Sequence, residues 1–307
     1  MGSAGSCIHM KFSNQTLKRL RPLLGTYVAI KLQGEAEEKL LNECITEGFT
    51  AVAEIDQLMS YHRADSDLTR LNQARPNEWV EVHVASAEVL TTANQLFLLS
   101  DGAFDIRCGG VLADHGILPA LSHNEYGHSV TDKNELPLEI RGSRVRKSGP
   151  WLLDLGGIAK GYAVDHAVKR MQRLAAGWKI FGMVNAGGDL RVWGDQSIST
   201  AIRIYGKSFS RLQPLSLNRT AVATSFVRKR SSKSKNLTAA AHVRMPSGDL
   251  YKKERTVTVF AQECLLADAL TKVVLLADLP IAEACLSTYN ARALIFGQEG
   301  QIEQIIG

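Results

Sequence analysis

Residues 152–171 read LLDLGGIAKGYAVDHAVKRM, an apolar run that passes through an acid and a glycine turn into an amphipathic helix. Gly156 and Gly157 permit close approach of the backbone, and the helix start offers free N–H groups and the positive end of the helix dipole. Lys160 supplies a charge that can neutralise phosphate. The spacing matches neither GxxxxGKS/T nor GxGxxG. Taken alone, the stretch is therefore more typical of a structural strand-to-helix turn than of a pyrophosphate site.

The composition is that of an ordinary globular protein. The chain has 307 residues, of which 45% are hydrophobic and 22% charged, so it can bury a substantial core. A net charge of +5 is mild for this length, and we expect no nucleic-acid partner. The five cysteines are scattered without a CxxC pair, which argues against a zinc finger or a dense disulfide framework. No apolar run reaches the roughly 18 residues that a membrane helix needs.

The apolar periodicity predicts helices and strands in mixed order. Intervals of three and four predict helices over 35–61, 85–100, 264–277 and 280–289, and one from the opening motif to about residue 174. Strands are predicted at 23–32, 199–206, 220–225, 255–261, 291–297 and 301–306, and a pair around a glycine turn at 178–194. We expect 62–79 to be a polar connection and 106–150 to be largely irregular. Without strict βαβ alternation, the order predicts an α+β fold.

Asp268 is an acid on an otherwise apolar predicted helix. Thr271 and Lys272 follow three and four residues later and therefore lie on the same face. Such an acid must be paired, exposed or bound to a metal. Aspartate and threonine oxygens suit a hard cation such as Mg²⁺. An ion pair between Asp268 and Lys272 is the simpler interpretation.

Other motifs carry polar residues whose role the sequence leaves open. GAFDI (102–106), VNAGGDL (184–190) and AVATS (221–225) each suit a structural turn or strand as well as a ligand contact. A lone histidine, His242, is more often a structural hydrogen-bonding group than a catalytic base.

The order of these motifs resembles that of the ApbE family of FAD:protein FMN transferases. The resemblance runs from about Arg21 to the C-terminus, with DLGGIAKGYAVD and NAGGD as its most specific parts. It implies transfer of FMN from FAD to a Thr or Ser hydroxyl of an acceptor flavoprotein, release of AMP, and a divalent cation, usually Mg²⁺. It also implies an α+β architecture of two lobes, in which antiparallel sheets are flanked by helices and FAD lies in the cleft. We therefore expect a tail at 1–20 and one domain at 21–307.

The resemblance also implies roles for individual residues. Two residues would be catalytic, His242 as the base for the incoming hydroxyl and Asp268 as the metal carboxylate. The metal would be bound by the Gly157 carbonyl, Asp268 and Thr271. The residues expected to contact FAD are Leu24, His62, Ala103, Phe104, Asp105, Asp154, Lys160, Asn185, Gly187, Gly188, Thr224, Val243 and Lys272.

The sequence departs from the family pattern at the expected metal site. The family's metal-binding threonine lies four residues after the aspartate, where this chain has Lys272, and Thr271 comes one residue early. Lys272 could reach the pyrophosphate, or it could pair with Asp268 and close the metal site, or the helix could let Thr271 coordinate. Three functions remain open: an active transferase, an FAD-binding protein without transfer activity, and an FAD pyrophosphatase that yields FMN and AMP.

Location is also left open by the sequence. Residues 2–10 look like a cloning remnant, which leaves open whether a natural export signal has been removed. Family resemblance favours the periplasmic side of a bacterial inner membrane, with a membrane tether in the uncut precursor. A cytoplasmic location is the alternative.

Overall fold

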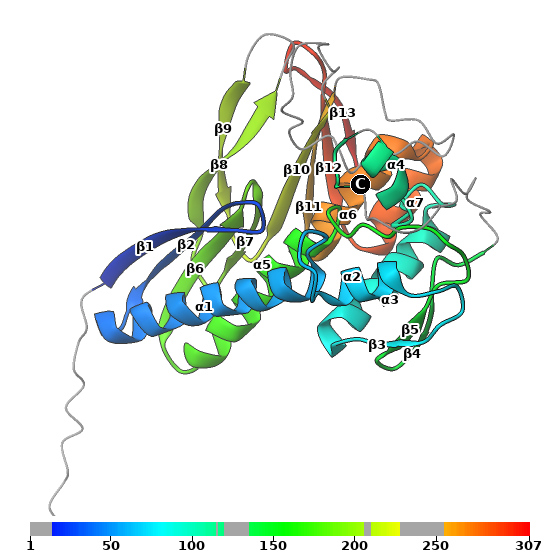
Figure 1. The fold of residues 1–307 in the computed structure, drawn as a ribbon. Coiled ribbons are helices and arrows are strands. Elements are labelled where there is room, and N and C mark those ends of the chain that lie inside the picture. The colour runs from blue at the N-terminus through cyan, green and yellow to red at the C-terminus, as the bar shows by residue number, and fades with distance from the viewer. Residues whose placement is uncertain (1–13, 115, 120–134, 206–209, 228–254) are drawn as a thin grey trace, which may run out of the picture.

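A computed structural model describes residues 14–114, 116–119, 135–205, 210–227 and 255–307. Its centre is an eight-stranded sheet in which every neighbouring pair is antiparallel (Figure 1). In spatial order the strands are β1 (Asn14–Leu23), β2 (Thr26–Glu35), β6 (Lys179–Ala186), β7 (Asp189–Trp193), β10 (Ala221–Val227), β11 (Arg255–Ala261), β12 (Arg292–Phe296) and β13 (Ile302–Ile306).

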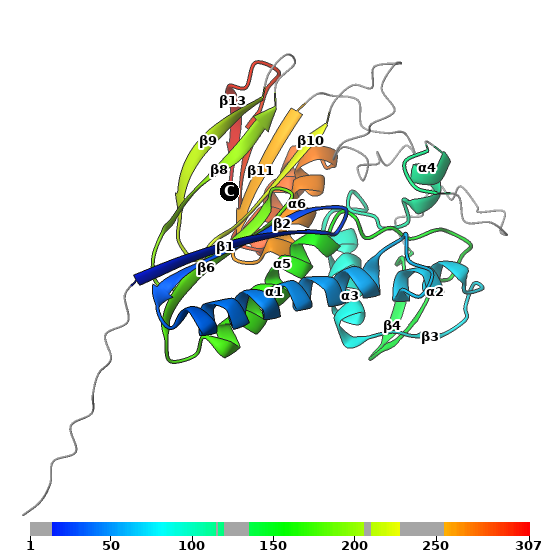
Figure 2. The ribbon, with the colours of Figure 1, turned by 60° about the vertical axis from the view of Figure 1, so that its left-hand side comes forward.

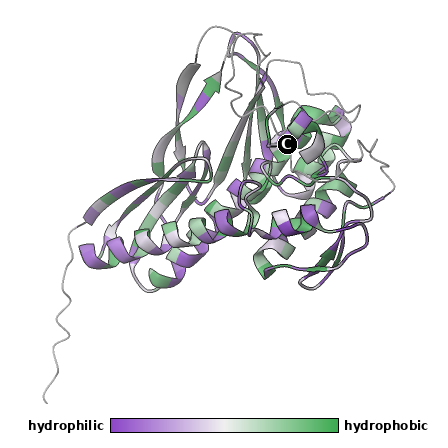
Figure 3. Cartoon of the chain, viewed as in Figure 1, coloured by the Kyte–Doolittle hydropathy of each residue, from purple (hydrophilic) through white to green (hydrophobic). Residues whose placement is uncertain are grey.

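Three helices pack against one face of the sheet. They are α1 (Glu38–Met59), α5 (Ala159–Leu174) and α6 (Cys264–Leu276), which contact β1–β2, β6–β7 and β10–β11 respectively. Hydrophilic and hydrophobic residues mix along α1 (Figure 3), and most of its apolar residues are buried in the core that α1 forms with α5 and the sheet. A second core lies under the hairpin of β8 (Ile198–Tyr205) and β9 (Ser210–Leu217), which contacts β10 and β11.

A smaller group of elements lies beside the sheet (Figure 2). It contains α2 (Asp67–Gln73), α3 (Val84–Leu99), α4 (Gly109–Asp114) and a three-stranded sheet of β3 (Val80–Glu81), β5 (Arg144–Arg146) and β4 (Glu139–Arg141). The last helix, α7 (Leu279–Thr288), contacts α6, α3 and β12. Among the described residues, no helix combines the length and apolar character needed to cross a bilayer.

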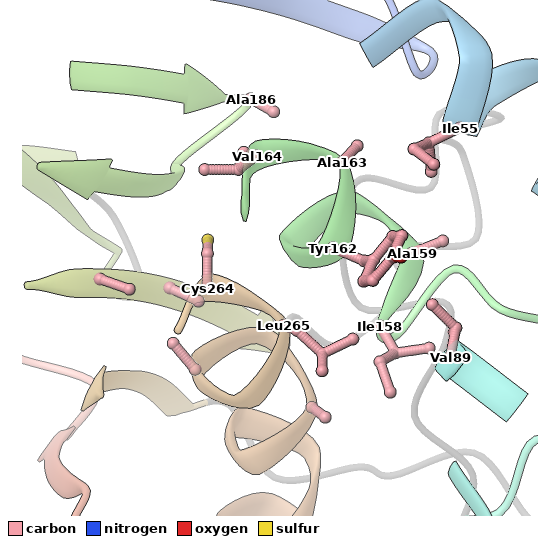
Figure 4. Close-up of a cluster of buried hydrophobic side chains, with 14 of the residues drawn as sticks. Ile55, Val89, Ile158, Ala159, Tyr162, Ala163, Val164, Ala186, Cys264 and Leu265 are labelled. Carbon is pink, nitrogen blue, oxygen red and sulfur yellow. The ribbon is translucent and has the colours of Figure 1, made fainter. Parts of the chain in front are cut away.

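Close approach of α5 and α6 depends on Gly161. A Cβ atom at this position would lie 2.2 Å from the carbonyl oxygen of Cys264, so any side chain here would push the two helices apart. Figure 4 shows Ile158 and Tyr162, at the start of α5, near Leu265 of α6. The glycine that follows Lys160 therefore brings the start of α5 next to the first turns of α6.

The predicted α+β class is confirmed, and the long helices lie where the periodicity placed them. Three local predictions were wrong, and one strand was missed. A tight turn divides the predicted strand 23–32, the polar connection contains α2, the irregular region contains α4, and β9 was not predicted. Residues 14–20, expected in the tail, belong to β1 and pair with β2. The single domain at 21–307 stays a prediction.

Candidate functional site

The segment before α5 is fixed by hydrogen bonds to its neighbours. The Asn72 side chain of α2 accepts from the Leu153 amide at 2.7 Å and donates to the Leu153 carbonyl at 2.9 Å. The Asp154 amide donates to the Ile106 carbonyl, and its carboxylate accepts from the Gly156 amide at 3.1 Å. Ile158 stands at the N-cap of α5 and has no polar side chain to cap it. The first-turn amides of α5 are bonded instead to other groups: Ala159 donates to the Leu155 carbonyl at 2.8 Å, and Gly161 donates to Asp268 Oδ2 at 3.2 Å.

Two lysines and two aspartates meet at this helix start, and we call them the lysine–aspartate cluster: Lys160, Asp189, Asp268 and Lys272. The Lys160 Nζ lies 3.2 Å from an Asp189 carboxylate oxygen and 3.6 Å from Asp268 Oδ2. Lys272 Nζ pairs with Asp268 Oδ1 and donates to the Asp268 carbonyl at 2.9 Å. Asp268 is fully buried, and Asp189 and Lys272 are each 5% exposed. The cluster thus joins α5, β7 and α6.

Mutual attraction controls the protonation of the cluster. Burial alone lowers the pKa of Lys160, but the charges of Asp268 and Asp189 outweigh burial and raise it. Burial alone raises the pKa of Asp268, but Lys160 and Lys272 outweigh it, and the pKa is lowered. For Asp189, burial and the charge of Asp268 together raise the pKa. Asp268 is therefore the more firmly ionised of the two carboxylates.

The residues expected to bind a metal do come together. Thr271 donates its hydroxyl hydrogen to the Asp268 carbonyl at 2.7 Å, so the Ser225 hydroxyl, 2.6 Å away, donates to Thr271. A Cβ atom built on Gly157 would lie 3.5 Å from Cε of Lys272. The expected ligands are thus neighbours, but Lys272 is among them.

These residues do not fit a divalent cation as they are arranged. Asp268 Oδ1 is paired with Lys272, while Oδ2 accepts from the Gly161 amide at 3.2 Å and faces Lys160. In the described part of the chain, no group of three or more His, Cys, Asp and Glu side chains is arranged to bind a metal. Two ammonium groups already neutralise the carboxylate that the metal would need.

The GAFDI motif forms the turn after α3 and lies beside the glycine turn. Ala103 and Phe104 are buried, and the Phe104 ring lies 3.8 Å from a Cβ atom built on Gly157. Asp105 is held by Arg107, whose Nη2 lies 3.0 Å from its carboxylate. This motif therefore forms one wall near the start of α5.

The NAGGD motif forms the tight turn between β6 and β7. Gly187 and Gly188 have φ values of +67° and +118°, and the Asn185 side chain accepts from the Gly188 amide at 3.0 Å. The Gly187 amide donates to the Tyr27 carbonyl at 3.3 Å, which brings this turn beside the β1–β2 turn. Leu24 lies in that second turn, with a φ of +55° that is unusual for a residue with a side chain.

The remaining predicted residues are less closely connected to the cluster. Thr224 is hydrogen-bonded to Thr258 across β10 and β11 at 3.0 Å, one residue from Ser225. His62 is exposed after α1, where its ring stands edge-on to Tyr61. His242 and Val243 lie outside the described residues.

One contributor, Asp165, was not predicted from the sequence, and two others, Asp189 and Ser225, lie in motifs whose role the sequence left open. Asp189 and Ser225 contact Lys160 and Thr271, and Asp165 accepts from the Cys264 and Leu265 amides at 2.9 and 2.8 Å. Asp165 thereby binds the start of α6 to α5. Its signal in the sequence was an acid within the apolar face of a helix. Asp189 had the weaker signal of an acid directly after two glycines.

The chain is similar in sequence to the ApbE family and to FAD:protein FMN transferases. Residues 24–295 match the ApbE family. FAD:protein FMN transferases of Vibrio cholerae and Haemophilus influenzae are 31% and 27% identical to this chain over 185 residues, 56% of its length in each case. These matches cover 53% and 52% of the relatives, so they span about half the length of those proteins.

Solved structures agree with the fold. The flavin transferase ApbE from V. cholerae superposes with a TM-score of 0.75 at 24% identity, over 93% of this chain and 94% of that one. The ApbE protein of Thermotoga maritima also gives a TM-score of 0.75 at 24% identity, over 94% and 97%. The family match covers most of the sequence, and the architecture is shared. The chain belongs to the ApbE family.

Proposed function

We propose that this protein transfers the FMN part of FAD to a Ser or Thr hydroxyl of an acceptor flavoprotein and releases AMP. The observation that carries the proposal is the pair of lysines, Lys160 and Lys272, beside the start of α5. A pyrophosphate is the part of FAD that such a site would bind, because its negative charge suits the ammonium groups and the positive end of the helix dipole. The names of the sequence relatives support the same activity.

The proposed reaction is a phosphoryl-type transfer. The acceptor oxygen forms a bond to the phosphorus of the FMN part, and the bond from that phosphorus to the bridging oxygen breaks. The bridging oxygen leaves with AMP and its electron pair, while the acceptor hydroxyl loses its proton to a base. His242 is the residue expected as that base. Positioning and neutralisation of charge are the main contributions of a protein to such transfers.

We assign no role in this reaction to the Mg²⁺ ion that family resemblance implies. Its predicted ligand Asp268 is already bound by Lys272 and faces Lys160. The hydroxyl of Thr271 is used by the Asp268 carbonyl and Ser225. We therefore assign the cationic contacts with the pyrophosphate to the two lysines alone. The periplasmic location and the membrane tether rest on family resemblance and remain proposals.

Incubation of the purified protein with FAD tests the proposal. The protein is supplied with or without a flavoprotein that carries a Ser/Thr flavinylation site, and AMP and covalent flavin are quantified. We expect AMP and covalent flavin in equal amounts, and only with the acceptor. Tight FAD binding without release of AMP would instead indicate an FAD-binding protein without transfer activity. Release of AMP and free FMN in the absence of acceptor would indicate an FAD pyrophosphatase.

A matched pair of variants relates the result to the site. Lys160→Met removes a lysine of the cluster, whereas Lys169→Met removes a half-exposed lysine of the same helix, whose Nζ lies 3.7 Å from Glu263. We expect AMP formation to fall in the first variant only. Equal activity in both would separate the transfer from the cluster.

A further inference from the structure

Lys272 lies where family resemblance implies a threonine that binds a metal. It is one helical turn after Asp268, and its Nζ donates to the Asp268 carbonyl at 2.9 Å and pairs with Oδ1. Its Cε and Cδ would lie 3.5 and 3.8 Å from a Cβ atom on Gly157. The side chain therefore runs past the glycine turn and ends on the buried carboxylate.

The contacts of Lys272 are those that a bound cation would make. A metal on Asp268 Oδ1 would sit within a few ångströms of this ammonium, because metal–oxygen bonds are about 2 Å long. Like charges at that separation in a buried site repel strongly. A metal could then enter only if Lys272 moved out of a position in which 5% of its surface is exposed.

We propose that Lys272 replaces the divalent cation of this site, so that the chain holds the pyrophosphate of FAD through Lys160 and Lys272 without a metal ion. This inference rests on the proposed function. An ammonium group has three donor hydrogens, and the described contacts of Lys272 use two of them on Asp268. The third is available for a phosphate oxygen. Lys160 supplies the second positive charge from α5.

The replacement changes how the site responds to solution conditions. A metal ion can be removed by a chelator, but a side chain cannot. Binding of FAD should therefore be the same in EDTA and in Mg²⁺. Removal of the Lys272 charge should make binding depend on the metal, because Asp268 and the hydroxyl of a threonine at position 272 could then hold it.

Binding of Mn²⁺, followed by electron paramagnetic resonance without nucleotide, tests the replacement directly. We expect no stoichiometric Mn²⁺ on the wild-type protein and one ion on Lys272→Thr, which Asp268→Asn in the same background removes. Lys169→Thr is the matched control and should stay like wild type. An ion on the wild-type protein that depends on Asp268 would overturn the proposal, and so would a folded Lys272→Thr variant that gains none. If Lys272→Thr does not fold, Mn²⁺ binding is measured on Lys272→Gln instead, which keeps a hydrogen-bond donor for Asp268 but lacks the positive charge.

Flavin fluorescence measures the affinity for FAD in EDTA and in Mg²⁺. We expect the same affinity in both for the wild-type protein, and an affinity about tenfold or more weaker for Lys272→Thr in EDTA, recovered with Mg²⁺. Mg²⁺-dependent binding by the wild-type protein would refute the replacement. Absence of FAD binding under both conditions would instead refute the proposed function, and the Mn²⁺ experiment would still decide the role of Lys272.

Discussion

The pairing of Asp268 with Lys272 predicts a strong energetic coupling within α6. Asp268 is fully buried and Lys272 nearly so, and removal of one partner from a buried ion pair costs about 3–5 kcal/mol. We place each single variant, Asp268→Asn and Lys272→Met, near the lower end, at about 3 kcal/mol. The reason is that Lys160 and the Gly161 amide still contact Asp268 when Lys272 is lost.

The double variant reveals whether the two residues act together. Once one partner is gone, the other is a buried charge without its main partner, so its loss costs little more and the double variant should be about as stable as either single one. The coupling between them should then reach about 3 kcal/mol, at the upper end for residues in contact. Urea unfolding followed by circular dichroism measures the free energy of unfolding of all four proteins.

An exposed pair provides the control for this cycle. Lys169 and Glu263 join α5 to the start of α6 at 3.7 Å, with side chains 50% and 39% exposed. The same cycle there, with Lys169→Met and Glu263→Gln, should give about 0–1 kcal/mol. Two results would refute a coupled pair: additive changes in the free energy of unfolding for Asp268→Asn and Lys272→Met, or a coupling no larger than that of the exposed pair.

Three further changes test the site and its surroundings. Lys160→Met should weaken FAD binding by about tenfold or more, because hydrogen bonds to a charged group are worth about 1.5–3 kcal/mol. Lys169→Met should leave FAD binding unchanged. Fluorescence titration measures the affinity of both variants. Gly161→Ala should lower the free energy of unfolding by at least about 1–3 kcal/mol, since its Cβ atom would meet a backbone carbonyl of α6. Gly110→Ala should be tolerated, because its Cβ atom would meet nothing within 4 Å. Equal thermal stability of the two variants would contradict this expectation. Burial lowers the pKa of Lys147 to about 8, below its unfolded value of 10.5, so the unfolded chain binds more protons between these pH values and stability should rise with pH there. Urea unfolding at pH 8 and pH 10.5 should show this rise, up to roughly 3 kcal/mol, relative to Lys147→Met, and equal pH profiles would count against it.

Long periodic elements could be predicted from the sequence, and short ones could not. The helices α1, α3, α5 and α6 each present an apolar face over several turns, which identifies them without tertiary information. In contrast, α2 has only seven residues and is capped by Ser66, whose side chain accepts from the Thr69 amide. Pro214 interrupts β9, which therefore reads as a loop. Such elements depend on packing against the rest of the chain.

The sequence predicted three residues of the cluster, Lys160, Asp268 and Lys272, and the ion pair that it favoured between Asp268 and Lys272 is present. Helical periodicity placed Asp268, Thr271 and Lys272 on one face, yet it could not show which groups lie across from that face. Lys160 lies across from that face, and α5 brings it to Asp268 because Gly161 allows close approach. A contact between two helices, such as that of Lys160 with Asp268, cannot be predicted from the spacing of residues within either helix.

The charge balance of the cluster gives the physical reason why position 272 matters. Two ammonium groups and two carboxylates are neutral together, so the cluster can be buried without a further ion. A threonine at position 272 would leave one ammonium between two carboxylates, and the excess negative charge would favour entry of a cation. The same substitution would weaken binding of a pyrophosphate unless a cation came with it. A single side chain on α6 therefore determines whether this site needs a metal to accept an anion.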